Sequence, residues 1–391
     1  MRIAYVTESF PPDVNGVAHT AVRVAEHLAS RGHEPLVIAP EPAAGVPRPD
    51  QSLDYPVVRV RSLPIPVYPD LRVGVPGPWL QAALAAHAPD VIHLASPFVL
   101  GARGCAAARR LQVPMVAVYA TDMGAYARTY HAGRIGQRAC WGRLRRIHNA
   151  ADRTLAPSTA SADDLREHGV ERVWVWGRGV DTRRFTPAKR DAGLRAQLAA
   201  SGEVIVGYVG RLAAEKRLEL LRGVAALPGV RLVITGGGPS EAAARRALPE
   251  AVFLGPRHGD ELAAIYASLD VFVHSGPHET FGNTLQEAAA SGLPVVAPAA
   301  GGPLDLVDDG HTGFLVTPGD QDAITHAVSR LVTSPALRLA QGQAARDRVL
   351  DRSWPASGDE LIGHYRAVLA ARQGGPGTGT GSMPLPAGSS A

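Results

Sequence analysis

The sequence predicts an α/β protein built from two doubly wound, parallel-sheet domains that face each other across a cleft. Three observations carry this prediction: the length of 391 residues, the alternation of short apolar runs with amphipathic segments, and the restart of that alternation near residue 203. At about 150 residues per domain, the length favours two or three domains. Strands that are almost wholly apolar and alternate with helices are typical of parallel sheets covered on both faces.

Both series of apolar runs can be placed along the chain. The first series predicts strands at residues 3–7, 36–39, 57–60, 91–94, 115–119 and 173–176. The second series predicts strands at residues 204–209, 232–235, 252–254, 271–274 and 295–297. Amphipathic segments between them predict helices, for example at residues 18–31, 78–87 and 158–168. Because the Gly-, Arg- and Pro-rich stretch 177–191 predicts a connector, we expect an N-terminal domain over residues 1–178 and a C-terminal domain over 179–355.

The composition is that of a folded globular protein. Hydrophobic residues make up 46% of the chain and charged residues 19%, which leaves enough apolar surface for sizeable cores. No stretch approaches the ~20 consecutive apolar residues of a membrane-spanning helix. The N-terminus lacks the apolar segment of a signal peptide, so we expect a cytoplasmic protein. Residues 373–391 are rich in Gly, Pro, Ser and Thr, and we expect them to form a disordered tail.

Residue counts and missing motifs exclude several classes of protein. Only two cysteines occur, Cys105 and Cys140, which excludes a disulfide scaffold and a cysteine-based zinc site. The net charge of +4 comes from 40 basic and 36 acidic residues and is too balanced to indicate a nucleic-acid partner. The phosphate-binding pattern G-x-x-x-x-G-K-[ST] is absent, so the chain is not a P-loop protein.

Ligands of open parallel sheets bind beyond the carboxyl ends of the strands, where helix N-termini present their positive ends. The first such segment, residues 8–17, contains a single glycine, so the G-x-G-x-x-G fingerprint of dinucleotide-binding enzymes is missing. This argues against a nicotinamide or flavin oxidoreductase. The amides of Asn15, Gly16 and Val17 can instead approach an anion, and an ordinary strand-to-helix turn is the equally weighted alternative.

Two cations and a glycine loop follow strands of the second series. Arg211 comes directly after the first of these strands, and Lys216 stands five residues later at a predicted helix start. A planar guanidinium fork and a compact ammonium group suit a diphosphate, although the same pair would be ordinary on a surface. Residues 236–238 are three consecutive glycines, which either let the backbone approach a ligand closely or form a tight turn.

The segment 278–292 carries two carboxylates around one predicted helix, residues 283–291. Glu279 lies on the loop before this helix, and Glu287 lies one turn after Asn283 on the same face. Paired acceptors suit the hydroxyls of a sugar and a ribose, while the helix N-terminus suits a phosphate. Two solvated glutamates are the alternative interpretation of this segment when it is taken alone.

Together these motifs resemble those of family 4 glycosyltransferases, retaining enzymes with the two-domain GT-B fold. The shared features are the E-x7-E pair, the glycine loop, and the motifs Gly210-Arg211-Leu212-x-x-Glu215-Lys216 and Arg178-Gly179-Val180-Asp181-x-x-x-Phe185. The resemblance covers roughly residues 1–372 and is closest to actinobacterial mannosyltransferases that use GDP-mannose. It implies transfer of mannose to a lipid or glycolipid acceptor resembling a phosphatidylinositol mannoside, with neither a metal nor another cofactor.

The resemblance also implies roles for individual residues. By the resemblance the catalytic set contains Arg211, Lys216 and Glu279, and we add Asp122 as a substitute for a histidine of the family. The donor-binding set is Gly16, Arg211, Lys216, Gly237, Arg257, Glu279, Phe281, Gly282, Asn283 and Glu287. Arg211 and Lys216 would bind the diphosphate, Glu279 the sugar hydroxyls and Glu287 the ribose. Arg257 belongs to the segment that holds the base, and Gly16 would close on the diphosphate from the other domain. The final helix, about residues 356–372, would cross back to the N-terminal domain.

One departure from the family concerns the acceptor side. Many relatives have a histidine two residues before the position of Asp122, where this chain has Ala120. We therefore expect Asp122 to contact the sugar or the acceptor in its place. Tyr126 and His93 are further acceptor candidates, although a histidine at a strand end is more often a packed structural residue.

The sequence leaves alternatives open for the acceptor and for the nucleotide base of the donor. The segment 134–151 projects Arg134, Arg138 and Arg145 on one side and apolar residues on another. Such a helix can contact an anionic membrane and so reach a lipid acceptor, or it can be an ordinary helix with one solvated face. Because the diphosphate motifs do not choose the base, a UDP-sugar-dependent transferase acting on a lipid or natural product is the alternative function. A non-catalytic nucleotide-sugar-binding protein is a remote one.

Overall fold

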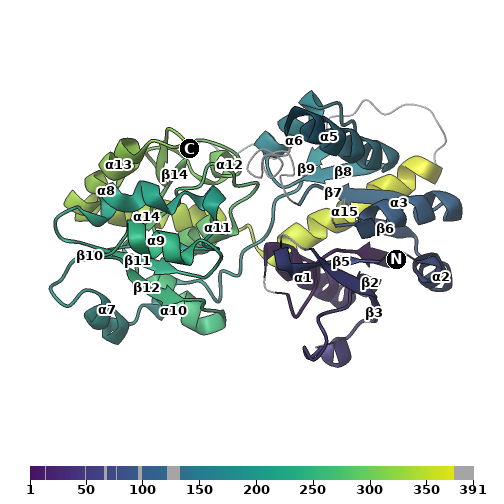
Figure 1. Cartoon of the computed structure of the whole chain (residues 1–391), viewed down its shortest axis with the longest axis horizontal. Coiled ribbons are helices and arrows are strands. Elements are labelled where there is room, and N and C mark those ends of the chain that lie inside the picture. Colours follow the sequence, from purple (N-terminus) through teal and green to yellow (C-terminus); the bar gives the residue numbers. More distant parts are fainter. Residues whose placement is uncertain are drawn as a thin grey trace.

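The computed structural model describes residues 1–13, 15–48, 50–65, 68–75, 77–95, 99–120 and 133–373. They form two domains that lie side by side, each with a parallel sheet between helices (Figure 1). The acceptor candidates Asp122 and Tyr126 lie outside the described residues, as does the expected tail apart from Gln373, which is the last residue of a helix. Within the described ranges no helix combines the length and the apolar composition needed to span a bilayer.

The N-terminal domain is built on a seven-stranded parallel sheet with the order β3-β2-β1-β6-β7-β8-β9. Its strands are β1 (Arg2–Val6), β2 (Glu34–Pro40), β3 (Val57–Val60), β6 (Val91–Leu94), β7 (Met115–Val118), β8 (Arg153–Ala156) and β9 (Val173–Val175). Its helices are α1 (Gly16–Ser30), α2 (Pro78–His87), α3 (Val99–Leu111), α5 (Gly133–Ala150) and α6 (Thr159–Glu167). A separate antiparallel hairpin consists of β4 (Ser62–Ile65) and β5 (Tyr68–Gly74).

The C-terminal domain has a six-stranded parallel sheet with the order β12-β11-β10-β13-β14-β15. Its strands are β10 (Val204–Val209), β11 (Val230–Thr235), β12 (Val252–Gly255), β13 (Val271–Val273), β14 (Val295–Pro298) and β15 (Gly313–Val316). Its helices are α7 (Ala192–Leu198), α8 (Arg222–Ala225), α9 (Glu241–Ala247), α10 (Gly259–Ser268), α11 (Asn283–Ala290), α12 (Pro303–Leu306), α13 (Gln321–Thr333) and α14 (Pro335–Val349). Apolar side chains on both faces of the sheet are buried under these helices, which is why the strands need no polar alternation.

The last helix, α15 (Trp354–Gln373), leaves the C-terminal domain and packs against the N-terminal one (Figure 1). Its residues Leu361 and Tyr365 are fully buried in the same core as Tyr5 of β1. The indole nitrogen of Trp176, just after β9, donates a hydrogen bond to the carbonyl oxygen of Ser357 at 2.9 Å. The two domains are therefore joined twice, by the connector after β9 and by α15.

Four strands were not predicted: β8, β15 and the two strands of the β4–β5 hairpin. β8 has the sequence Arg-Thr-Leu-Ala and β15 begins with glycine, so neither contains an apolar run long enough to stand out. The β4–β5 hairpin lies in a proline-rich stretch. All four form because neighbouring strands supply hydrogen-bonding partners, which is information that a local pattern does not contain.

Each sheet has one position at which the chain order reverses. In the N-terminal sheet it lies between β1 and β6, and in the C-terminal sheet it lies between β10 and β13. Loops that leave the carboxyl ends of two such strands diverge to opposite sides and leave a crevice between them. The loops after β1, β10 and β13 carry Gly16, Lys216 and Glu279, so the fold places the predicted donor residues at these two crevices.

Candidate active site

Lys216 and Glu279 form an ion pair between the loops that follow β10 and β13. The two strands are direct neighbours, with Gly207 opposite Phe272, so their outgoing loops run next to each other. The Lys216 ammonium group donates to Oε2 of Glu279 at 2.7 Å, and the two side chains are only 17% and 20% exposed. Lys216 ends a single 3-10 turn, Ala214–Lys216, and does not open a helix as the sequence predicted.

The ionisation of Glu279 is controlled by its cationic surroundings. Burial acts to raise the pKa of this carboxyl, but the charges of Lys216 and His274 and the hydrogen bond from Lys216 outweigh it and lower the pKa to about 2. The Nε2 atom of His274 lies 3.7 Å from Oε2 of Glu279. Burial and the Lys216 charge in turn lower the pKa of His274 to about 4, so the ring is neutral at pH 7. At neutral pH the Lys216–Glu279 pair therefore consists of an ammonium ion and a carboxylate.

The other predicted cation, Arg211, lies at the rim of the site. Its guanidinium donates to Oε1 of Glu215 at 2.6 Å, and its side chain is 42% exposed. The glycine loop supports the backbone on which Arg211 stands: a Cβ atom on Gly236 would lie 1.9 Å from the carbonyl oxygen of Gly210. The carbonyl oxygen of Gly237 accepts a hydrogen bond from the amide of Leu212 at 2.9 Å. A Cβ atom on Gly238 would likewise lie 2.4 Å from the carbonyl oxygen of Leu212, so close packing on the Arg211 loop accounts for Gly236 and Gly238 without a ligand.

The N-terminus of α11 is open toward this ion pair. Gly282 occupies the N-cap position with φ 105°, a conformation that favours glycine, and no side chain of the described residues caps the helix. Phe281 before it is buried, and Oδ1 of Asn283 is buried without a hydrogen-bond partner in the described part of the chain. Uncapped amides and the helix dipole together favour an anion at this position.

Glu287 lies one turn along α11 and is held by a tyrosine. The hydroxyl of Tyr266 donates to Oε2 of Glu287 at 3.0 Å. Burial raises the pKa of Glu287 to about 7, against the opposing effect of this hydrogen bond. The two carboxyls of the E-x7-E pair therefore differ in ionisation: Glu279 is charged throughout the physiological range, whereas Glu287 titrates within it.

Gly16 approaches these residues from the N-terminal domain. A Cβ atom added to it would lie 3.2 Å from Nδ2 of Asn283 and 3.4 Å from a terminal nitrogen of Arg178. Oδ1 of Asn15 accepts hydrogen bonds from the amides of Val17 and Ala18, both at 3.0 Å. The Asn15 side chain therefore caps α1 and occupies two of its first amides. One of these, the amide of Val17, was among the amides expected to approach an anion.

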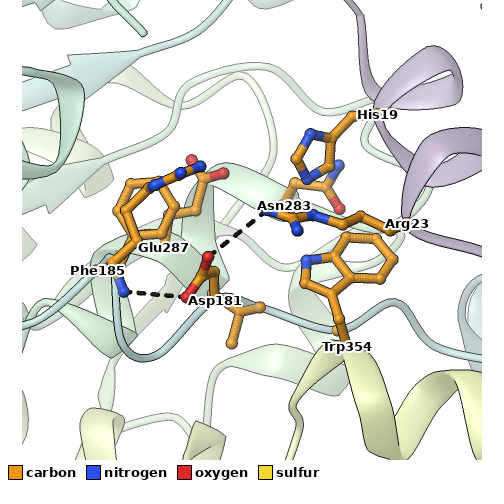
Figure 2. A pocket seen from close by; sticks show the side chains of 10 residues that line it. His19, Arg23, Asp181, Phe185, Asn283, Glu287 and Trp354 are labelled. Carbon is orange, nitrogen blue, oxygen red and sulfur yellow. Dashed lines mark hydrogen bonds and ion pairs between the residues drawn. The ribbon is translucent and has the colours of Figure 1, made fainter. Parts of the chain in front are cut away.

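A pocket lies beside this contact, between α1, the connector, α11 and the start of α15 (Figure 2). Figure 2 shows His19 and Arg23 of α1 facing Asn283 and Trp354, with Arg23 reaching toward Asp181 of the connector. Glu287 also lines it. The pocket thus combines elements of both domains with two of the predicted donor residues.

Two further hydrogen bonds connect α6 of the N-terminal domain to the C-terminal domain. The amide of Thr159, at the start of α6, donates to a carboxylate oxygen of Asp305 at 2.6 Å. The hydroxyl of Ser161 donates to the carbonyl oxygen of Thr280 at 3.4 Å. The loop that carries Glu279 is therefore held from both domains.

The remaining predicted residues lie outside this cluster. Arg257 is on the loop after β12 and pairs with Glu261 at 2.7 Å. His93 is fully buried: its Nδ1 atom shares a hydrogen bond with the hydroxyl of Tyr365 at 2.7 Å, and its ring stacks on Tyr5. This is the packed structural arrangement that the sequence analysis named as the alternative for His93, and we leave it out of the acceptor site.

Two residues near the site were missed as functional candidates. Arg178 belongs to the connector and was quoted only as part of a motif, and His274 ends the run that predicted β13. A polar residue directly after an apolar run was the available signal for His274. For Arg178 there was none, because only the closure of the two domains brings the connector beside Gly16 and Phe281.

Comparisons with known proteins agree with the architecture and the motifs. The model for glycosyltransferase family 4 matches residues 14–184, and that for glycosyl transferases group 1 matches residues 190–348. A GDP-mannose-dependent alpha-mannosyltransferase of Mycobacterium tuberculosis is 50% identical over 95% of this chain and 98% of its own. The protein of the same name from Corynebacterium glutamicum is 41% identical over 98% of this chain and 95% of its own.

Solved structures show the same two-domain fold. The crystal structure of Anabaena Alr3699/HepE in complex with UDP has a TM-score of 0.77 and 21% identity, and covers 94% of this chain and 100% of that one. At this identity the likeness concerns the fold, which is GT-B. The family matches and the full-length relatives together establish that the chain belongs to glycosyltransferase family 4.

Proposed function

We propose that the protein transfers mannose from GDP-mannose to a lipid or glycolipid acceptor resembling a phosphatidylinositol mannoside, with retention of configuration at the sugar. The observation that carries the proposal is the Lys216–Glu279 ion pair beside the uncapped N-terminus of α11. The names of the relatives that are 41% and 50% identical support the choice of donor.

The site offers different chemistry to each part of such a donor. Lys216 and Arg211 bring positive charge to the diphosphate, and the first-turn amides of α11 add hydrogen-bond donors. The ionised carboxylate of Glu279 suits the hydroxyls of the sugar. Glu287, one helical turn after Asn283 on α11, suits the hydroxyls of the ribose. The segment after β12 with Arg257 suits the base.

Catalysis in this proposal consists mainly of stabilising the leaving group. The bond between the sugar carbon and the phosphate oxygen breaks, and the diphosphate keeps the bonding electrons. The acceptor oxygen bonds to the same face of the sugar, and its proton passes to the departing phosphate oxygen. Cations and amides that are already in place stabilise the charge that develops on the diphosphate. Asp122, and Tyr126 as a further candidate, would contact the acceptor or the sugar.

The identity of the base has a specific alternative. The solved structure with the same fold contains UDP, and none of the contacts described for the diphosphate depends on the base. A UDP-sugar-dependent transferase would use the same Lys216, Glu279 and α11. Only the segment after β12 would differ, because it would bind uracil in place of guanine.

Calorimetry with GDP and with UDP, without added metal, tests the donor. Selective binding of GDP supports the proposal, and transfer is then assayed from GDP-mannose to phosphatidylinositol mannosides. Selective binding of UDP contradicts the proposed donor and favours the alternative. Binding of neither nucleotide would contradict a catalytic role and leave the non-catalytic interpretation.

The proposal of a lipid acceptor is supported by the exposed face of helix α5. On this helix Leu144 and Ile147 are buried against the domain, while Arg138 and Arg145 are exposed, and Ile135 near its start is 84% exposed. Exposed arginines next to an exposed apolar side chain suit the surface of an anionic membrane, where a lipid acceptor would be found.

Flotation with vesicles at low salt tests this contact. We expect binding to vesicles that contain an anionic phospholipid and none to neutral vesicles. The double substitution Arg138→Glu and Arg145→Glu should abolish it. Absence of binding by the unchanged protein would remove the membrane from the proposal without affecting the donor.

A further inference from the structure

Arg178 connects the two halves of the donor site. It stands on the connector after β9, between the domains. One terminal nitrogen lies 3.4 Å from where a Cβ of Gly16 would be, and its guanidinium carbon lies 5.9 Å from the centre of the Phe281 ring. Its charge also acts on Glu279 and on Tyr5 of β1. The guanidinium is therefore enclosed by both domains at the point where Gly16 meets α11.

This guanidinium differs from the other cations of the site because it has no counter-ion among the residues that the structure describes. Lys216 is paired with Glu279, and Arg211 with Glu215. Within the described ranges Arg178 makes no hydrogen bond and no ion pair, although it is half-buried. Burial lowers the pKa of Arg178, and Glu279 opposes that effect. A guanidinium has five donors, and no residue of the described ranges accepts a hydrogen bond from those of Arg178, so they remain available to an incoming group.

The charges nearby do not supply the missing partner. Glu279 is already neutralised by Lys216 at 2.7 Å, and His274 is uncharged at pH 7 because its pKa is about 4. Lys216, Glu279 and Arg178 together therefore carry one net positive charge. The uncapped N-terminus of α11 lies on the same side and adds to this positive potential. The group that fits beside Arg178 is an anion.

We propose that Arg178 is a third donor-binding cation, which donates hydrogen bonds to the phosphate that carries the sugar. This inference rests on the proposed function, because it concerns the same donor site. Gly16 on one side and Phe281 on the other confine the guanidinium, so Arg178 reaches the phosphate only when both domains are in place. The same phosphate leaves with the bonding electrons, and Arg178 stabilises the charge that it acquires.

Calorimetry with GDP and GMP tests this assignment, because GMP lacks the second phosphate. The variants are Arg178→Gln, Arg178→Lys and the control Arg183→Gln, which removes one exposed positive charge from the same connector. For Arg178→Gln we expect GDP affinity to fall about ten- to a hundredfold, the usual effect of losing a hydrogen bond to a charged group. GMP affinity should not change. Arg178→Lys should recover part of the loss, and Arg183→Gln should behave like the unchanged protein.

The outcomes separate this inference from the proposed function. If the unchanged protein binds neither GDP nor UDP, the proposed function fails, and the inference fails with it. If it binds GDP and Arg178→Gln binds GDP equally well, only the inference is overturned. A parallel loss of GDP and GMP affinity, with Arg178→Lys no better than Arg178→Gln, would show a purely structural role and overturn it as well. If UDP binds in place of GDP, the same comparison is made with UDP and UMP.

Discussion

The ammonium group of Lys216 and the carboxylate of Glu279 lie 2.7 Å apart across two loops that leave neighbouring strands of the C-terminal sheet. Both groups are assigned to the donor, one to the diphosphate and one to the sugar. Without a ligand they satisfy each other. Donor binding therefore has to share or replace this contact, and the charge of Lys216 helps to keep Glu279 ionised.

Removing the ammonium group should impair catalysis without unfolding the protein. For Lys216→Ala we expect kcat/KM to fall about a hundredfold or more, the usual cost of losing one preorganised donor to developing charge. Transfer from GDP-mannose to phosphatidylinositol mannosides measures it, with circular dichroism as the test of folding. Lys189→Ala is the matched control, because Lys189 forms an ion pair with exposed Asp260. Near-normal turnover by a folded Lys216→Ala protein would contradict the role.

The affinity for GDP-mannose should depend on pH through Glu287. Burial raises its pKa to about 7 in the free protein, and ribose hydroxyls that donate to the carboxylate favour its ionised form. Binding therefore lowers the pKa of Glu287 and releases a proton at pH values below 7. We expect affinity about tenfold weaker at pH 6 than at pH 8, since protonation competes with binding by one factor of ten per pH unit below the pKa.

Calorimetry in buffers of different ionisation enthalpy measures this proton release directly. Glu287→Gln should bind GDP-mannose more weakly at pH 8 and show no pH dependence between pH 6 and 8. Glu279 cannot cause the effect, because its pKa of about 2 lies far below this range. A pH dependence that persists in Glu287→Gln would assign the titration to another group.

A side chain at position 16 should keep the donor out. The Cβ of alanine would lie 3.2 Å from Nδ2 of Asn283, which a small shift can accommodate, but the branches of valine have no room between Asn283 and Arg178. For Gly16→Val we expect kcat/KM to fall about a hundredfold, the cost that a displacement of 1 Å can have. The effect of Gly16→Ala should be smaller. Gly363→Val is the control, because a Cβ there meets no atom of the described residues within 4 Å. Equal activity of Gly16→Val and Gly363→Val would contradict the close approach of the two domains.

The hydroxyl of Tyr365 should matter for stability and not for chemistry. It holds Nδ1 of buried His93 at 2.7 Å, and burial lowers the pKa of His93 to about 3, so the ring is neutral. Tyr365→Phe leaves a buried nitrogen without its partner, and we expect the free energy of unfolding to drop by about 1–3 kcal/mol. Urea titration measures it.

Tyr55→Phe is the matched control for that experiment. Tyr55 is also buried, but its hydroxyl has no hydrogen-bond partner in the described part of the chain. Its removal should therefore leave stability unchanged or slightly increased. If the two variants lose the same stability, the contact between α15 and β6 contributes nothing specific.

Strand prediction succeeded where burial on both faces leaves a pattern in the sequence. β1, β2, β6, β10 and β11 are apolar along nearly their whole length because helices cover both faces of each sheet. β8 and β15 were not predicted because their apolar runs are short. The four residues of β8 include an arginine and a threonine, and the four residues of β15 begin with glycine. Their strand state comes from backbone pairing with β7 and β14.

The sequence by itself determined the chemical types and the spacing of the site residues. Arg211 and Lys216 stand five residues apart after one strand, and Glu279 and Glu287 flank the start of one helix. Such local relationships follow from the helical repeat and from the position of a strand end. They were enough to indicate a diphosphate and a polyol as ligands.

Only the tertiary structure decided which of these groups meet. The pairing of β10 with β13 places Lys216 against Glu279, 63 residues further along the chain. The approach of the two domains places Gly16 and Arg178 against α11. Strand order and domain closure are set by the packing of whole sheets and helices, a sum over contacts that are distant in the sequence, so no local pattern contains them. The ionisation of Glu279 and Glu287 depends on the same packing, because burial and neighbouring charges shift the two pKa values in opposite directions.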